Sequence, residues 1–140
     1  MTPQEAKEIL LFQSGAHDEI DDPRWESGFL RNLRPFTGLR EENFHQIMEA
    51  IRALAPTLSN SKTCDTGVVS ALWSICHLGR AWGLDSEGML QRNGILNHED
   101  TKRLQHWINN ISYTCHCLFD GCDVDTAFED YDHSLATGAP

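Results

Sequence analysis

Basic side chains are scarce in this sequence, and it contains no long apolar run. Only 11 Lys and Arg stand against 21 Asp and Glu, so the net charge is −10 at pH 7. A field of that sign repels phosphate backbones and anionic lipid headgroups, which argues against nucleic acid and membranes as partners. The apolar run over residues 9–12 is far shorter than the roughly 18 residues that a membrane span requires. We therefore expect a partner protein with a basic surface.

The five cysteines are an odd number and include no Cys-x-x-Cys pair. They cannot all form disulfides within one chain, and the first residues show no secretion signal. Reduced thiols in the cytoplasm are the simplest interpretation. In a helix, Cys115 and Cys117 would point about 200° apart, so they could not bind one ion together. We expect neither a metal ion nor another cofactor.

Motifs for catalysis are also missing. The sequence has no Gly-x-Ser-x-Gly nucleophile motif and no glycine-rich phosphate loop, so it favours binding over catalysis. One polar strip, formed by Ser70, Ser74, His77 and Arg80, interrupts an otherwise apolar segment, and the last three of these residues are the candidate site. Its simplest interpretation is a histidine that is hydrogen-bonded at the edge of the core. The alternative is a small-ligand-binding protein or an enzyme, in which the strip lines a pocket and Arg80 neutralises a small anion.

Helix signals are frequent, whereas the alternating pattern of strands is absent. Capping residues, prolines and glycines delimit the predicted helices. These cover residues 3–14, 23–34, 40–55, 66–82, 86–92, 98–119 and 124–131. The predicted fold is an all-α, single-domain bundle of six or seven helices. We assign residues 1–121 to a helical domain, 122–133 to an acidic amphipathic tail helix and 134–140 to an extension.

Residues 66–82 differ from the other predicted helices because apolar side chains surround most of the helical circumference. A helix of this kind normally lies at the centre of a bundle and is covered by its neighbours on all sides. We therefore predict that this segment is the central apolar helix of the fold.

The tail combines an acidic face with an apolar one. Residues 120–140 carry six Asp and Glu and no Lys or Arg. Val124, Ala127, Phe128 and Tyr131 follow the helical spacing of three, four and seven residues. We expect this helix to pack on the domain or on a partner.

Two groups of side chains are candidates for a contact surface with another protein. The helix over residues 98–119 has a nearly uncharged face that is typical of contact surfaces. The tail adds acidic groups that would accelerate encounter with a basic partner. The candidates are His106, Asn109, Tyr113 and His116 on the helix, and Asp123, Asp125, Glu129, Asp130 and Asp132 in the tail.

The sequence therefore predicts a protein–protein interaction module. In its most concrete form, this is an acidic inhibitor or immunity-type protein that masks a basic effector such as a nuclease. Besides the small-ligand alternative, a second alternative is a homo-oligomeric structural protein, for example a homodimer joined through the face of residues 98–119.

Overall fold

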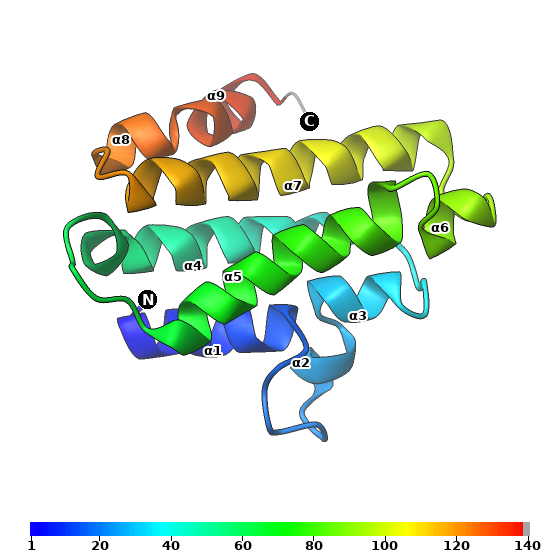
Figure 1. Cartoon of the computed structure of the whole chain (residues 1–140), viewed down its shortest axis with the longest axis horizontal. Coiled ribbons are helices and arrows are strands. Elements are labelled where there is room, and N and C mark those ends of the chain that lie inside the picture. Colours follow the sequence, from blue (N-terminus) through cyan, green and yellow to red (C-terminus); the bar gives the residue numbers. More distant parts are fainter. Residues whose placement is uncertain (139–140) are drawn as a thin grey trace.

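Four long helices form the framework of the protein (Figure 1). The computed structural model describes residues 1–138, and every regular element within them is helical, which confirms the all-α single-domain class. In the described residues, no helix combines the length and the apolar character needed to cross a membrane. Helices α4 and α7 run in one direction, and α1 and α5 run in the opposite one (Figure 1). The bounds are α1 (Pro3–Gln13), α4 (Glu41–Ser59), α5 (Thr66–Gly79) and α7 (His98–Phe119).

Capping side chains determine where α1 and α7 begin. The Thr2 hydroxyl accepts a hydrogen bond from the Glu5 amide at 3.2 Å, and the Glu5 carboxylate accepts one from the Thr2 amide at 2.7 Å. At α7, the Asn97 side chain accepts a hydrogen bond from the Asp100 amide at 2.8 Å. These contacts satisfy amides that the first turn of a helix leaves free. The predicted starts of both helices are confirmed.

The core lies between α4 and the helices around it. The rings of Phe44 in α4 and Trp107 in α7 stack with their centroids 5.7 Å apart. Offset stacking of this kind adds to the free energy gained by burying the two rings. The fully buried aliphatic side chains around this pair include Ile47, Ile51, Ile75, Leu104, Ile108 and Ile111.

Helix α4 extends beyond its predicted end at residue 55. Pro56 lies inside the helix, which continues to Ser59. A proline in a helix interior removes one backbone hydrogen bond, and local sequence therefore predicts a stop. Leu58 is buried in the last turn, so packing against the core holds this turn in the helical conformation.

The helix predicted for residues 23–34 is divided into α2 (Pro23–Glu26) and α3 (Phe29–Leu33). The break falls at Gly28, which lies against the end of α1. A Cβ at Gly28 would be only 2.4 Å from the carbonyl oxygen of Phe12, so only glycine fits here without a shift. This close approach explains why the helix is interrupted.

Helix α5 contacts α1, α3 and α7, as expected for a helix in the middle of the bundle. However, it is not covered on all sides, because the indole of Trp73 is 62% exposed and His77 is also exposed. The expectation that neighbours enclose the whole segment is therefore wrong. The outward apolar side chains of α5 instead form one wall of an open groove.

A single wide turn, η1 (Arg80–Leu84), continues α5. It is a π-helical turn, in which the amide of Asp85 donates to the carbonyl of Arg80 at 2.9 Å. π-Turns are rare and often lie at functional sites. The helix predicted for residues 86–92 is reduced to α6 (Met89–Arg92), because the backbone of Gly88 packs against the carbonyl of Ala81.

The tail folds back onto α4 and α7 as α8 (Val124–Ala127) and α9 (Glu129–Thr137) (Figure 1). Ala127, Phe128 and Tyr131 are buried in the core of the domain itself. Arg52 of α4 lies over the Phe128 ring at 4.2 Å and donates to the Asp132 carboxylate at 2.5 Å. Helix α9 includes residues 134–137, which the sequence analysis assigned to an extension. Residues 139–140 of that extension lie outside the described residues.

Candidate functional site

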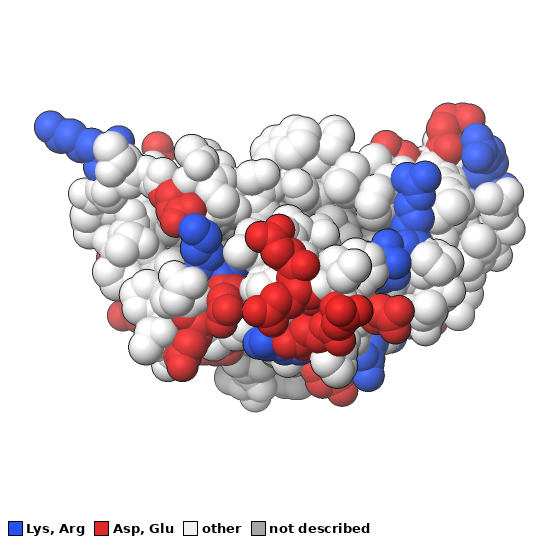
Figure 2. Space-filling view, turned by 90° about the horizontal axis from the view of Figure 1, so that it is seen from below, with Lys and Arg blue, Asp and Glu red and all other residues white. Residues whose placement is uncertain are grey.

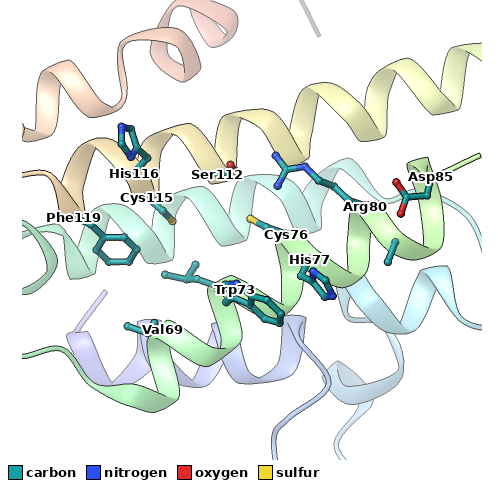
Figure 3. A pocket seen from close by; sticks show the side chains of 12 residues that line it. Val69, Trp73, Cys76, His77, Arg80, Asp85, Ser112, Cys115, His116 and Phe119 are labelled. Carbon is teal, nitrogen blue, oxygen red and sulfur yellow. The ribbon is translucent and has the colours of Figure 1, made fainter. Parts of the chain in front are cut away.

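An open groove of about 590 Å³ lies between α5 and α7. Its walls are largely apolar and include two exposed aromatic side chains, Trp73 of α5 and Phe119 at the end of α7, the latter 46% exposed. Figure 3 shows that the side chains of Cys76 and Cys115 enter the space from opposite helices. At the other end, Arg80 extends from the π-turn toward α7 (Figure 3). The groove can hold an apolar group with a polar end.

The two thiols of the groove are poor nucleophiles. Burial raises the pKa of Cys76 to about 11, although the nearby Arg80 opposes this shift. Burial also raises the pKa of Cys115. Both side chains are therefore neutral thiols at pH 7, whereas nucleophilic attack by cysteine requires a thiolate. They act as apolar lining of the groove.

The predicted polar strip is only partly assembled. His77 and Arg80 line the groove, but Ser74 does not. The His77 imidazole is exposed and stacks on the Trp73 indole, with the ring centroids 4.3 Å apart. Arg80 donates a long hydrogen bond of 3.4 Å to the side-chain oxygen of Asn109 in α7. Because His116 and Asp85 also line it, the groove offers two imidazoles, one guanidinium and one carboxylate.

The predicted contact face of α7 divides into an open part and a covered part. Asn109, Tyr113 and His116 are exposed, and the Tyr113 ring is 53% exposed. His106 is half-buried and lines a small cavity with His45 and Tyr131, the latter from the tail. Burial lowers the pKa of His106, so it is neutral at pH 7. Only the open part is available to another molecule.

The acidic side chains of the tail also differ in availability. Asp123 caps α8 by accepting the amide of Thr126 at 2.8 Å, and Asp132 is neutralised by Arg52. Asp125, Glu129 and Asp130 are exposed and form no ion pair within residues 1–138. Three of the five predicted carboxylates are therefore free to attract a cation.

A second acidic segment was missed by the sequence reasoning. The end of the loop between α1 and α2, together with α2 itself, carries five acidic residues within residues 18–26, and we call this segment the acidic loop. Asp18, Glu19, Asp21 and Glu26 are exposed and unpaired in the described chain, whereas Asp22 binds Arg24 at 2.9 Å. Figure 2, which views the face with α1 and α2, shows Asp and Glu gathered near its centre. The local density of acidic residues in the sequence could have revealed this segment.

An exposed apolar side chain lies in the middle of the acidic loop. Ile20 is 62% exposed, with acidic neighbours on either side in the chain. An isoleucine with most of its surface exposed contributes little to the core, but covering it with a partner is favourable in free energy. The acidic loop therefore combines long-range attraction with a short-range apolar contact.

Within residues 1–138, no group of three or more His, Cys, Asp or Glu side chains could hold a metal ion. No protein-family model matches this sequence, and comparisons with curated proteins and with solved structures also give no match.

Proposed function

We propose that this protein is an interaction module that binds a partner with a basic surface, as an acidic inhibitor or immunity-type protein would. The observation that carries the proposal is the acidic loop, in which four exposed carboxylates form no ion pair within residues 1–138 and Ile20 is flanked in the chain by acidic residues. A reducing cytoplasm is part of the proposal, because all five cysteines are free thiols in the described structure.

Electrostatics supports a charged partner over a neutral one. Carboxylates at a protein surface that lack a local cation create a negative potential, which raises the rate of encounter with a positive surface. The tail helices α8 and α9 lie on the other side of the bundle from the acidic loop (Figure 1), so their exposed carboxylates Asp125, Glu129 and Asp130 add to the net negative charge of the protein and not to the local field of the loop. Salt screens exposed charges over a Debye length of about 8 Å at physiological ionic strength. Binding of this kind must therefore weaken as salt is added.

The test is affinity capture from extracts of the native host with three triple variants that each remove three negative charges. The first changes the acidic loop, the second changes the tail, and the third is the control and changes scattered exposed acids. The variants are D18N/E19Q/D21N, D125N/E129Q/D130N and E87Q/E99Q/D120N. A fourth variant, I20S, removes the apolar contact and leaves the charge unchanged. The partner is then purified and titrated by calorimetry at two salt concentrations.

We expect a basic protein to be captured by the wild type and by the control variant, and to be lost with the acidic-loop variant. The affinity should fall between low salt and about 0.15 M salt for the wild type, and fall less for the acidic-loop variant. I20S should weaken binding by a similar factor at both salt concentrations. A captured partner that is acidic, or one that binds all three charge variants equally, would refute the proposal.

A second candidate function is small-ligand binding in the groove between α5 and α7. Its volume of about 590 Å³ is that of ordinary ligand pockets, which span about 300 to 1,000 Å³. An aromatic anion would place its ring against Trp73 and its charge beside Arg80. The fluorescent dye anilinonaphthalene sulfonate tests this, with W73A and R80Q as variants. Dye binding that neither substitution reduces would contradict the second candidate.

A further inference from the structure

Two arginine side chains share a pocket that neither the acidic loop nor the groove explains. The pocket has a volume of about 480 Å³ and lies where the end of α1, the helices α2 and α3, and the π-turn η1 meet. Arg31 comes from α3, and Arg34 follows its end. Trp25 of α2 and Trp82 of η1 form apolar walls. Segments far apart in the sequence therefore converge on two positive charges.

Each guanidinium lies over the face of an indole ring. The Cζ atom of Arg31 is 4.1 Å from the centre of the Trp25 ring, and that of Arg34 is 5.3 Å from the centre of the Trp82 ring. Stacking on a ring occupies the face of a guanidinium but leaves the N–H groups at its edge free. The indoles therefore restrain both cations while their donors remain available to a ligand.

The two cations have no anionic partner in the described chain. Neither guanidinium forms an ion pair or a hydrogen bond within residues 1–138, and no carboxylate lines the pocket. Glu26 is next to Trp25 in the chain, but it does not line the pocket. The Nε atom of Arg31 is buried without a hydrogen-bond partner, the only such side-chain atom in the described residues. An unpaired buried donor is costly, so the described chain leaves the hydrogen-bonding capacity of the Arg31 guanidinium unsatisfied.

We propose that this pocket binds the phosphate group of a small phosphate monoester. Guanidinium groups bind tetrahedral oxyanions through paired N–H donors, and two of them match the charge of a phosphate monoester, about −1.5 to −2 at pH 7. The free edges of Arg31 and Arg34 supply these donors. The two indoles would contact the organic part of the ligand. This site is independent of the proposed binding of a basic protein, because it requires the opposite charge in its ligand.

The experiment titrates the intact protein with inorganic phosphate, phenyl phosphate and benzoate. Binding is measured by calorimetry, and the Nε–H resonance of Arg31 is followed by NMR. The variants are R31Q and R34Q, with R92Q as a control that removes one exposed arginine with no ion pair in the described residues. Thermal denaturation shows whether each variant is folded. R34Q is the decisive variant if R31Q unfolds, since Arg34 is exposed.

We expect both phosphate probes to bind and to shift the Arg31 resonance, with phenyl phosphate binding more tightly. R34Q should weaken binding by about tenfold or more, because it removes a charge-assisted hydrogen bond, whereas R92Q should leave the affinity unchanged. The absence of binding at millimolar phosphate would overturn the proposal. Equal weakening by R34Q and R92Q would also overturn it, and so would benzoate binding as tight as that of phenyl phosphate.

Discussion

Replacing Phe128 by alanine should destabilise the whole domain, because the tail is part of its core. Phe128 is fully buried, and its ring contacts the Arg52 guanidinium and the Tyr131 ring. Truncation of a buried phenylalanine to alanine costs about 3–5 kcal/mol in the free energy of unfolding. Loss of the contact with Arg52 is included in that range and accounts for about 0.5–1 kcal/mol of it. The free energy of unfolding of a domain is only about 5–15 kcal/mol, so the loss expected for Phe128→Ala is a large fraction of the total stability.

The assay is urea denaturation of the wild type, Phe128→Ala and the matched control Leu135→Ala, followed by circular dichroism. Leu135 also lies in the tail but is 52% exposed, so its truncation should change the free energy of unfolding by less than about 0.5 kcal/mol. Proteolysis of the tail should accelerate only in Phe128→Ala. A loss below about 1 kcal/mol in Phe128→Ala would refute the packing described for the tail, since removal of a buried ring cannot cost so little unless the site is open.

Three further predictions follow from single contacts. Asp65→Ala should lower the free energy of unfolding by about 1–2 kcal/mol, because it removes the N-cap of α5. Lys7→Gln should lower it by less than about 1 kcal/mol, because it removes only the exposed ion pair with Asp65. Equal losses of stability for the two variants in urea denaturation would contradict this prediction. In a Tyr113→Phe background, ultraviolet titration should show Tyr131 ionising with a pKa of about 12, mainly because the ring is buried. The stability that this group contributes is therefore lost as the pH rises from about 10 to 12. A titration midpoint near pH 10 would refute the burial of Tyr131. Gly28→Ala should destabilise the fold by about 1–3 kcal/mol in the same denaturation assay, because its Cβ meets a backbone carbonyl; an unchanged midpoint would contradict the close approach.

Local sequence predicted most of the helices because their end signals depend on neighbouring residues alone. The Thr2 capping box and the Asn97 cap act within one turn, and both were found where expected. Pro56 and Gly28 behave differently. The helix continues past Pro56 because Leu58 packs against the core, and it breaks at Gly28 because α1 approaches closely. Contacts of that kind join distant parts of the chain, so no local pattern contains them.

The candidate sites also differ in whether local sequence or only the tertiary fold reveals them. The acidic loop could have been found from the sequence, since its five acids within nine residues are a local signal. The open side of α5 could not be predicted from the sequence. An apolar helical face has the same residue pattern whether a neighbouring helix covers it or, as at Trp73, it is left exposed. The pocket around Arg31 and Arg34 depends on Trp25 and Trp82, which only the tertiary fold brings together. Pairing of charges is likewise a tertiary property, as Arg52 and Asp132 illustrate.

The most direct test of the central claim is an NMR titration of the isotope-labelled protein with the basic partner recovered by capture. The account predicts that the largest amide shifts fall within residues 16–27, which contain the acidic loop. It also predicts that added salt reverses these shifts. Shifts concentrated along α5 and α7, with the acidic loop unchanged, would contradict the account.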